Sequence, residues 1–491
     1  MTPDILIVSN RGPKDFVWDE GRWVARPSSG GLVSMLSPLA SKPTVSWFCC
    51  VSEPPDAALA QEGLFTSAAD QLDAGLHVVP VPVPAPTFHA YYGRISNEVL
   101  WMLQHRVLGR GGYEYLDRGR YDAWADGYLA ANRMLADAIA VSCASARAIL
   151  VQDYHLYPLP ALLRRKYPRA PILHFTHIPF FDVGLMKLIP PSWRETILRG
   201  LLGADVVGFQ TDDDRDAFLA CCAEFLHVQC DSPSASVTAA DGRCVRARTY
   251  AASVDVAGLA RDVRSKHVAA ARARLAFDPR MKHVIRVDRL DPSKNQLIGF
   301  RAFERLLETR PDLRAHARFS AFLVPSRTDL GVYRAYRETV FACIETINNR
   351  FEKDCGGRPI QVFYTNDRDQ ALAAMADCDL LLVNSLEDGM NLVAKEWAMI
   401  SRRPGVLVLS ETTGVAAEAG DSALMISPLD IEGTARAMAT ALDMPPEERQ
   451  HRIDRFRRRI EAWTAHDWLA AQLADLRVPA EILDLPSALP A

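Results

Sequence analysis

Residues 380–396 have the sequence LLLVNSLEDGMNLVAKE, and this stretch decides the fold class of the chain. The apolar run at its start predicts a buried strand, Asp388-Gly389 predicts a tight turn, and residues 392–400 predict a helix. A helix start presents free backbone N–H groups and a partial positive charge, which favour a bound diphosphate. Glu396 follows within the first turns of that helix, where its carboxylate could accept two hydrogen bonds from a ribose diol. Alone the motif is weakly specific for a nucleotide, because Asp-Gly turns before helices are common.

Strands and helices alternate along the rest of the chain in the same way. In the first half we predict strands at residues 5–9, 45–48, 76–83, 148–152, 172–176 and 205–209, a hairpin over 16–24, and helices over 32–39, 121–141 and 158–165. In the second half we predict strands at residues 284–287, 321–324, 361–364, 380–384 and 406–409, and helices over 296–308, 333–351, 369–376 and 392–400. This alternation predicts the α/β class, with two doubly wound parallel sheets whose ligand sites lie at the carboxyl ends of the strands.

The junction between the two sheets is predicted near residue 250, after a Ser/Pro-rich break at 232–236. We therefore place an N-terminal Rossmann-like domain at residues 1–250 and a C-terminal one at 251–460. In residues 461–478, leucines share one helical face, which predicts a helix that packs back on the first domain. The proline-containing tail, residues 479–491, predicts a frayed end.

The composition indicates a globular chain with large cores. It has 491 residues, of which 49% are hydrophobic and 24% charged, and this suggests two or three domains without global disorder. The net charge is −4 and no long basic block occurs, which argues against nucleic acid or an anionic membrane as a partner. Residues 1–10 lack a signal-peptide pattern, and no apolar run of about twenty residues could span a bilayer. The sequence therefore predicts a cytoplasmic protein.

Neither the cysteines nor the acidic runs predict a metal site. The ten cysteines form no C-x-x-C pair and no cluster with zinc-ligand spacing, so we predict buried free thiols in a reducing compartment. Asp212-Asp213-Asp214 resembles the metal-binding Asp-x-Asp motif of some glycosyltransferases, but it follows Thr211 at a predicted helix start. Acids in a first helical turn offset the helix dipole, so we interpret the run as part of a helix cap.

Charged and polar side chains follow several predicted strands, where a ligand would bind. Arg289 and Lys294 follow the strand at 284–287, and two cations there suit phosphate oxygens, although neighbouring aspartates could neutralise them. Asp153 ends the strand at 148–152 and could orient a sugar hydroxyl. His177 ends the next strand and could donate to a sugar oxygen, although a histidine at a strand end is more often structural.

Other known nucleotide and hydrolase motifs are missing from the sequence. Gly30-Gly31 opens a predicted helix and would let an anion approach the backbone, but a turn with a helix cap is the simpler interpretation. The spacing does not fit a dinucleotide fingerprint. The sequence contains no G-x-S-x-G, no P-loop and no H-E-x-x-H, so it does not indicate a serine hydrolase or a zinc protease.

The chain resembles the trehalose-6-phosphate synthase family from residue 5 to about residue 476, because it carries the motifs of that family in order. The motifs are Ser9-Asn10-Arg11, Gly30-Gly31-Leu32, Ser96-Asn97 with Leu100-Trp101, Asp153-Tyr154-His155, His177-Ile178-Pro179, Gly208-Phe209-Gln210-Thr211, Arg289-Leu290-Asp291 with Ser293-Lys294, and Asp388 through Glu396. The resemblance implies a retaining glycosyltransferase of the GT-B fold, with two Rossmann-like domains facing across a cleft. It also implies transfer of glucose from UDP- or GDP-glucose to glucose 6-phosphate, which gives α,α-trehalose 6-phosphate.

The resemblance assigns roles to individual positions. The residues that it implies at the reacting groups are Arg289, Lys294, His177 and Asp388. The donor-binding residues that it implies are Gly30, Gly31, Asn366, Asn391, Leu392, Val393, Ala394, Lys395 and Glu396, with the backbone contributing from Leu392 to Lys395. The acceptor-binding residues that it implies are Arg11, Tyr92, Trp101, Asp153 and Arg327, of which Arg11, Tyr92 and Arg327 hold the phosphate. It implies no metal and no cofactor, since cations and helix N–H groups would stabilise the diphosphate leaving group.

The chain departs from the family pattern near both predicted substrate sites. The departures are Cys49-Cys50 near a usual second Trp, Asn295 in place of a Gly, Glu387 in place of a common Arg, and Asn366 in place of an aromatic residue. Divergent relatives with such changes include glucosylglycerol-phosphate synthases and pseudo-glycosyltransferases that act on cyclitols, so another phosphorylated acceptor stays open. The donor base also stays open, because members use UDP-, GDP- or ADP-glucose.

Rivals of other classes are an epimerase or a phosphorylase with the same fold, and a sensor without activity. A phosphorylase would carry a pyridoxal-binding lysine, and the absorbance of that cofactor would reveal it. The presence of Arg289, Lys294, Asp388 and Glu396 argues against an inactive sensor. We expect small-molecule substrates as partners, and the sequence does not decide between a monomer and a homo-oligomer.

Overall fold

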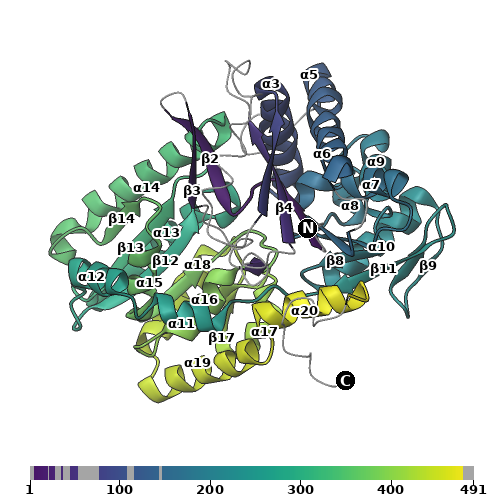
Figure 1. Ribbon diagram of the computed structural model, residues 1–491. Coiled ribbons are helices and arrows are strands. Elements are labelled where there is room, and N and C mark those ends of the chain that lie inside the picture. Colours follow the sequence, from purple (N-terminus) through teal and green to yellow (C-terminus); the bar gives the residue numbers. More distant parts are fainter. Residues whose placement is uncertain are drawn as a thin grey trace. The chain divides into compact units, whose positions relative to one another are not determined.

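A computed structural model describes residues 5–19, 22–27, 35–36, 45–52, 77–107, 116–142 and 146–478, and the chain divides into two units (Figure 1). Unit 1 comprises Met1–Gln104, Tyr113–Ala252 and Ala465–Ala491, and unit 2 comprises His105–Gly112 and Ser253–Thr464. The division in the middle of the chain falls after Ala252, beside the junction predicted near residue 250. The predicted domain 1–250 does not account for His105–Gly112, because that short segment groups with unit 2.

The sheet of unit 2 is purely parallel and has six strands in the order β14-β13-β12-β15-β16-β17. The strands are β12 (Lys282–Arg289), β13 (Ala317–Val324), β14 (Ile360–Tyr364), β15 (Leu380–Val383), β16 (Val406–Ser410) and β17 (Ala423–Ile426). Every residue of β15 is buried, as the apolar run predicts for a parallel strand covered on both faces. The pairing of Val284 with Leu380 and of Ile285 with Leu381 fixes the register of β12 against β15.

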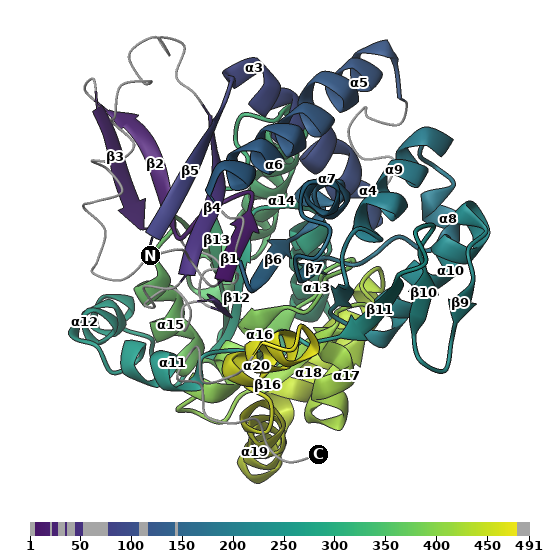
Figure 2. The same cartoon turned by 45° about the vertical axis from the view of Figure 1, so that its right-hand side comes forward.

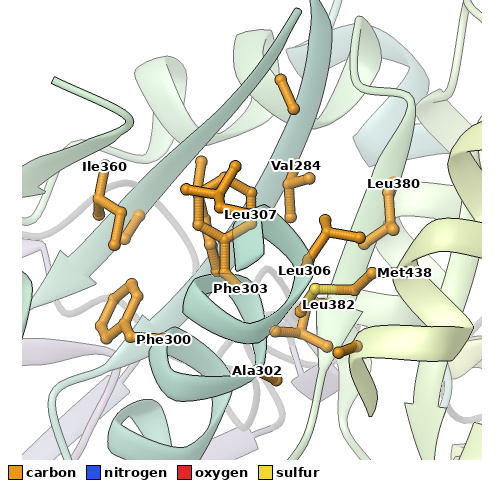
Figure 3. Close-up of a cluster of buried hydrophobic side chains, with 14 of the residues drawn as sticks. Val284, Phe300, Ala302, Phe303, Leu306, Leu307, Ile360, Leu380, Leu382 and Met438 are labelled. Atoms are coloured by element: carbon orange, nitrogen blue, oxygen red, sulfur yellow. The ribbon is translucent and has the colours of Figure 1, made fainter. Parts of the chain in front are cut away.

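Helices cover the unit 2 sheet. One core cluster combines β-strand residues with side chains of α13 (Gln296–Thr309), α14 (Gly331–Cys355) and α18 (Ile431–Asp443). Figure 3 shows Phe303 and Leu306 among the other apolar side chains of this cluster, with Val284 and Leu382 nearby. Burial of each such side chain stabilises the fold by about 1.5–3 kcal/mol. Other helices of the unit are α11 (Val256–Asp262), α12 (Lys266–Leu275), α15 (Arg368–Ala376), α16 (Leu392–Ile400), α17 (Val415–Ala419) and α19 (Pro446–Glu461).

The main sheet of unit 1 has nine strands in the order β5-β4-β1-β6-β7-β8-β11-β10-β9, and Figure 2 shows β1, β6 and β7 side by side. The parallel strands are β1 (Ile5–Ser9), β4 (Val45–Ser52), β5 (His77–Val83), β6 (Ala148–Gln152), β7 (Ile172–Phe175), β8 (Val206–Phe209) and β11 (Cys244–Thr249). Two short antiparallel strands, β9 (Cys230–Asp231) and β10 (Ser236–Thr238), extend one edge. The predicted hairpin over 16–24 is confirmed as β2 (Lys14–Asp19) paired with β3 (Arg22–Pro27). The prediction of the α/β class with two Rossmann-like domains is thereby confirmed.

Two helices of unit 1 contain π-helical segments, which the sequence does not predict. One runs through α3 (Ala85–Phe88), η2 (His89–Leu100) and α4 (Trp101–Gln104), and the other through α5 (Arg118–Asp122), η3 (Ala123–Leu129) and α6 (Ala130–Ser142). They pack so closely that a Cβ on Gly127 would lie 2.6 Å from the Cβ of Ala90. Segments of π-helix occur often at functional sites, and η2 carries the predicted site residue Tyr92.

The last described helix, α20 (Ala465–Asp475), belongs to unit 1, although unit 2 precedes it in the chain. Arg246 Nη1 of β11 donates to Asp475 Oδ1 at 2.9 Å, and Trp468 Nε1 donates to the Tyr250 carbonyl at 3.2 Å. The Trp468 ring also packs edge-on against Phe175, with ring centroids 5.1 Å apart. This helix lies within the predicted range 461–478, whereas the predicted tail 479–491 and most of the predicted helix 32–39 lie outside the described residues.

Candidate functional site

The sheet of unit 2 has its topological switch point between β12 and β15. From β12 the chain proceeds to β13 and β14 at one edge, then returns to β15 on the other side of β12 and continues to β17. The loops after β12 and β15 therefore diverge, which opens the strand ends to a ligand. Lys294 lies after β12 and Asp388 lies after β15, so both of these predicted site residues lie at the switch point.

Lys294 and Asp388 form an ion pair. Both side chains are 12% exposed, and the same carboxylate oxygen of Asp388 accepts hydrogen bonds from Ser385 Oγ at 3.2 Å and from Asn391 Nδ2 at 3.0 Å. Burial opposes the ionisation of Asp388, but Lys294 and Asn391 outweigh burial, and the pKa of Asp388 lies below its usual value. The switch point thus carries an ammonium group and a carboxylate in direct contact, which suits a ligand that has both phosphate and hydroxyl groups.

Helix α16 begins at this ion pair. Asn391 caps the helix with its side chain, which accepts from the Ala394 N–H at 3.2 Å, and its backbone has a left-handed φ of 75°. Asn tolerates this conformation better than most residues do, which explains the sharp turn between β15 and α16. The first turn of the helix, from Leu392, carries the partial positive charge of a helix start and adds to the charge of Lys294.

Lys395 and Glu396 face different partners within α16. The Lys395 side chain is fully buried and donates from Nζ to Glu418 Oε1 at 2.7 Å, and burial lowers its pKa. Only the backbone of Lys395 could therefore contact a ligand, as the family resemblance implies. Glu396 pairs with Arg368, with Nη1 and Oε1 3.0 Å apart, so a ribose diol would compete with this guanidinium for the carboxylate. Asn366 lies between the end of β14 and α15, on the same carboxyl edge of the sheet.

Arg327 binds Asp291 in a buried ion pair. Arg327 Nη1 lies 2.7 Å from Asp291 Oδ2 and 2.7 Å from the Tyr333 hydroxyl, and the two charged side chains are 6% and 0% exposed. Burial opposes the ionisation of Asp291, but Arg327 and then Arg289 overcome it and lower its pKa to about 2. Arg289 itself is exposed at the end of β12. Arg289 is therefore more accessible than Arg327 to an anion that arrives from solvent.

Sequence reasoning missed Arg286, a fully buried arginine in the middle of β12. Its guanidinium donates twice to Asp288 Oδ2, at 2.9 and 2.7 Å, and once to the carbonyl of Lys294, at 2.9 Å. A buried charge is tolerated only when it is paired and hydrogen-bonded. Arg286 therefore fixes the backbone of the loop that carries Lys294. A basic residue inside the otherwise apolar run 284–287 was the signal that could have identified it.

Two departures from the family pattern have structural explanations in unit 2. Asn295 has a left-handed φ of 56°, a conformation that glycine adopts easily and Asn tolerates. Its Nδ2 donates to the carbonyls of Asn384 at 3.1 Å and Pro428 at 2.8 Å, and these bonds tie the loop after β12 to the ends of β15 and β17. Glu387 pairs with Arg106, with Oε2 and Nε 3.2 Å apart, so the acidic residue has a partner within unit 2.

The unit 1 sheet has its own switch point, between β1 and β6. The chain runs from β1 to β4 and β5 at one edge and then returns to β6 on the other side of β1. Arg11 follows β1 and Asp153 follows β6, so two of the predicted acceptor residues lie at this switch point. It is the second place in the molecule where the topology opens a parallel sheet to a ligand.

Asp153 has a strained backbone at this position. Its φ of 75° and ψ of 168° lie in a region that is nearly restricted to glycine and costs about 1–3 kcal/mol for other residues. Its N–H donates to the Phe175 carbonyl at 2.7 Å, and its Oδ1 accepts from the His177 N–H at 3.1 Å. Because such strain persists only where the surroundings impose it, the ends of β6 and β7 together fix this carboxylate.

His177 is a neutral side chain in this structure. Burial, and after it the neighbouring His174, lowers the pKa of His177 to about 3. Its Nε2 lies 2.8 Å from Gln152 Oε1. Because an amide oxygen accepts, Nε2 carries the proton, and Nδ1 is then the nitrogen with a lone pair. In this tautomer, Nδ1 of His177 offers a lone pair to a ligand hydroxyl.

Aromatic side chains surround the other predicted acceptor residues. The Arg11 guanidinium lies 5.7 Å from the centroid of the Tyr92 ring, and Tyr92 stacks on His155 with centroids 5.8 Å apart. Trp101 packs against Tyr154, with centroids 5.6 Å apart. The hydrogen bonds of this cluster run from Tyr154 Oη to Asn97 Oδ1 at 2.8 Å and from Asn97 Nδ2 to the Tyr92 carbonyl at 2.7 Å. The structure therefore joins Arg11 with Tyr92 and Trp101 with Tyr154, next to Asp153 in the chain.

The Cys49-Cys50 departure lies at the carboxyl end of β4, next to β1. Both thiols are buried, and burial raises the pKa of Cys50 above its ordinary value. The Cys50 N–H donates to the Asn10 carbonyl at 3.1 Å, which ties this strand end to the residue before Arg11. Two small, uncharged side chains thus stand beside the end of β1, and their S–H groups are weaker donors to a phosphate than an indole N–H is.

The interpretation of Asp212–Asp214 as part of a helix cap is confirmed. Thr211 Oγ1 accepts from the Asp214 N–H at 3.2 Å, and the three acids occupy the first turn of α10 (Asp212–Leu226). Asp214 also accepts from the Phe180 N–H at 2.7 Å. Among the described residues, no group of His, Cys, Asp and Glu side chains could hold a metal ion.

The nine described cysteines are free, and all except Cys230 and Cys244 are buried. Gly30 and Gly31 lie outside the described residues.

Two parallel α/β units, each with charged or polar residues at its switch point, are the framework of a GT-B glycosyltransferase. The sequence matches the profile of glycosyltransferase family 20 over residues 3–478, and the chain belongs to that family. The prediction of a glycosyltransferase similar to trehalose-6-phosphate synthases is thus confirmed. None of the helices in the described part of the chain has both the length and the apolar character needed to span a bilayer.

Individual relatives agree with this assignment. The trehalose-6-phosphate synthase of Mycolicibacterium smegmatis is 33% identical over 498 aligned residues, which cover 98% of this chain and 94% of the relative. A trehalose-phosphate synthase structure from Burkholderia xenovorans in complex with glucose-6-phosphate has a TM-score of 0.79 and 30% identity, with 96% of this chain and 99% of that chain covered. An E. coli structure bound with UDP-2-fluoro glucose has a TM-score of 0.81 and 28% identity, with 96% and 98% covered.

Proposed function

We propose that the protein transfers glucose from a nucleotide-glucose to glucose 6-phosphate, with retention of the anomeric configuration, and so makes α,α-trehalose 6-phosphate. The observation that carries the proposal is the Lys294–Asp388 pair at the start of α16, on the switch point of unit 2. It offers one cation for a diphosphate and one carboxylate for sugar hydroxyls. The ligands in the related structures, glucose-6-phosphate and UDP-2-fluoro glucose, support this choice of substrates.

The donor half of the proposed reaction uses the residues of unit 2. Cleavage of the bond between glucose C1 and the diphosphate oxygen leaves a nucleoside diphosphate and a sugar with oxocarbenium character. Arg289, Lys294 and the N–H groups of the first turn of α16 stabilise the charge that develops on the leaving group. Asp388 accepts hydrogen bonds from glucose hydroxyls. Glu396 accepts hydrogen bonds from the ribose diol, and its carboxylate is then shared between the diol and Arg368.

The acceptor half uses the residues of unit 1 together with Arg327. Arg11, Tyr92 and Arg327 hold the phosphate of glucose 6-phosphate, Trp101 lines the sugar site, and Asp153 binds a hydroxyl. The anomeric hydroxyl of the acceptor attacks C1 on the face from which the diphosphate departs. Its proton passes to the departing phosphate oxygen, so the protein needs no carboxylate pair of the glycosidase type.

One observation favours a phosphorylated acceptor other than glucose 6-phosphate. The buried thiols of Cys49 and Cys50 lie beside the end of β1, which Arg11 follows. Thiols donate more weakly to a phosphate than an indole N–H does, so glucose 6-phosphate would bind more weakly here and a different phosphorylated acceptor could be admitted. Glycerol 3-phosphate and a cyclitol phosphate are the chemical alternatives with the same donor chemistry.

The deciding experiment crosses nucleotide-glucose donors with sugar and polyol phosphates and measures release of nucleoside diphosphate. UDP-, GDP- and ADP-glucose are each tested with glucose 6-phosphate, glycerol 3-phosphate, inositol phosphate and water. We expect the largest release with glucose 6-phosphate, and a product whose anomeric configuration by NMR is α,α. Release no greater than with water, alongside clear release with glycerol 3-phosphate, would show that the proposed acceptor is wrong.

A further inference from the structure

His174 lies fully buried at the end of β7, directly against Asp153. Its Nε2 is 3.2 Å from the Asp153 carbonyl oxygen, and because a carbonyl can only accept, Nε2 carries the proton and donates. The other ring nitrogen, Nδ1, is buried and has no hydrogen-bond partner among the described residues. The ring packs on Tyr157 with centroids 5.5 Å apart. Within the described structure, the polar contact of this ring is therefore with Asp153.

The contact acts on the strained peptide of Asp153. The carbonyl of Asp153 accepts from His174 Nε2 and from the Leu156 N–H, which lies at 3.0 Å. The orientation of this carbonyl is set by the ψ angle of Asp153, whose value of 168° completes the glycine-like conformation. A donor aimed at the carbonyl from the neighbouring strand holds that angle. Without it, the residue can relax toward a β conformation and release the backbone strain.

We propose that His174 is a positioning residue that holds Asp153 in its left-handed conformation and thereby places the Asp153 carboxylate for the acceptor hydroxyl. The proposal rests on the proposed function, in which Asp153 binds the acceptor. A histidine that only filled the core would be needed for its shape, whereas a positioning histidine is needed for its Nε2–H.

The test separates ring shape from the donor group. His174→Phe keeps a planar ring and removes the donor, and His174→Gln restores an N–H near the position of Nε2. We expect His174→Phe to raise KM for the sugar phosphate roughly tenfold or more, while KM for the nucleotide-glucose changes less than about twofold, because misplacing a substrate-positioning group by about 1 Å can cost up to about 100-fold. His174→Gln should restore most of the wild-type affinity for the sugar phosphate.

His283 provides a matched control in unit 2. It is also buried, its Nε2 lies 3.0 Å from the Asp278 carbonyl, and its ring stacks on Phe277 with centroids 4.2 Å apart. His283→Phe removes the same kind of bond, and so should lower the melting temperature comparably to His174→Phe without raising KM for the sugar phosphate. Equal KM profiles for the two Phe variants, or no rescue by Gln, would overturn the positioning role.

A crystal structure of His174→Phe keeps this test independent of the acceptor. We expect Asp153 to leave the left-handed region in the variant, and an unchanged φ near 75° would overturn the proposal whichever acceptor the enzyme uses. If wild-type protein releases no nucleoside diphosphate with glucose 6-phosphate, the proposed function fails. The KM measurements are then made with the sugar or polyol phosphate that the donor–acceptor panel identifies, and they decide the role of His174 separately.

Discussion

The two switch points of the molecule use opposite electrostatics. At the one between β12 and β15, buried charges are kept and paired, since Lys294 binds Asp388 and Arg327 binds Asp291. At the one between β1 and β6, buried titratable groups lose their charge, because burial lowers the pKa of both His174 and His177 to about 3. The same topology thus supports buried ion pairs in unit 2, whereas in unit 1 it places neutral histidines and aromatic rings around Arg11 and Asp153.

The difference matches the chemistry proposed for each half. A diphosphate leaving group develops negative charge, which preorganised cations stabilise most strongly when water is excluded. A sugar hydroxyl is neutral and needs orientation, which a fixed carboxylate and neutral ring nitrogens supply. The comparison therefore predicts that changes in unit 2 act through charge and that changes in unit 1 act through geometry.

The largest effect is expected when the buried pair of Asp291 and Arg327 is broken. Asp291→Asn leaves the guanidinium of Arg327 without its anion in a site where the two side chains are 0% and 6% exposed. Loss of one partner of a buried pair destabilises by about 3–5 kcal/mol, because the remaining charge stays desolvated. Chemical denaturation followed by circular dichroism measures the change in the free energy of unfolding. The surface pair of Arg310 and Asp312, whose aspartate is 60% exposed, is the control, and Asp312→Asn should change the free energy of unfolding far less, because solvent screens an exposed pair. Equal destabilisation by the two variants would contradict the contrast between buried and exposed charge.

Lys294 should show the next largest effect, on turnover. Lys294→Met removes the ammonium from the switch point of unit 2 and leaves Asp388 with Ser385 and Asn391 as hydrogen-bond donors. We expect kcat to fall by about 10²- to 10³-fold, the usual effect when one group that stabilises a developing charge is removed. Steady-state kinetics measures it, with Lys282→Met as a control, since Lys282 donates to the Leu442 carbonyl at 2.6 Å on the amino-terminal side of the same strand. Turnover within tenfold of wild type would remove Lys294 from the proposed mechanism.

The two neutral histidines predict a particular pH dependence of stability. Their folded pKa of about 3 lies below the ordinary histidine pKa of 6.5, so the unfolded chain binds more protons between these pH values. Their contribution to stability is therefore complete above pH 6.5 and is lost as the pH falls toward 3. Removing one of them should make unfolding less sensitive to acid, so His174→Phe should lose less stability than wild type over this window. Denaturation midpoints measured across the window test this, and parallel pH profiles would contradict it.

The smallest effect is expected from metal removal. The proposed charge stabilisation uses Arg289, Lys294 and helix N–H groups, so EDTA should leave turnover unchanged. Assays with and without the chelator, followed by addition of Mg²⁺ or Mn²⁺, measure this. If EDTA abolishes activity and a divalent ion restores it, then a metal ion stabilises the leaving group, and the assignment of that role to Arg289, Lys294 and helix N–H groups is wrong.

Local patterns in the sequence were sufficient to predict the donor half of the molecule in detail. The apolar run 380–384, the Asp388-Gly389 turn and the helix 392–400 correspond to β15, the loop and α16 within one residue. These elements depend on nearest neighbours and on burial, which the hydrophobic pattern encodes. The side chains at the switch point came from the family resemblance, and the structure brings Lys294 and Asp388 into contact.

Long-range contacts account for what the sequence did not predict. The π-helical segment η2 lies where its helix packs closely against Gly127 of the neighbouring helix, and no local sequence pattern predicts that contact. The partners of Arg327 and Glu396 are separated from them by 36 and 28 positions in the chain, so they became visible only in three dimensions. The role of Arg286 was missed because a charged residue in a strand normally indicates a solvent-facing position.

The placement of α20 makes the order of synthesis important for this enzyme. Trp468 lies against His177, with ring centroids 6.1 Å apart, and it also bonds the Tyr250 carbonyl, yet it is translated after the whole of unit 2. Unit 1 therefore cannot reach its native packing while the ribosome is still making unit 2, although its first strands have long been available. A nascent chain interrupted before this helix would carry Ser253–Thr464 of unit 2 in full, whereas its unit 1 would lack α20. Quality control acting on such a chain would encounter an exposed surface around Phe175 and Tyr250, the two residues that Trp468 contacts in the finished fold.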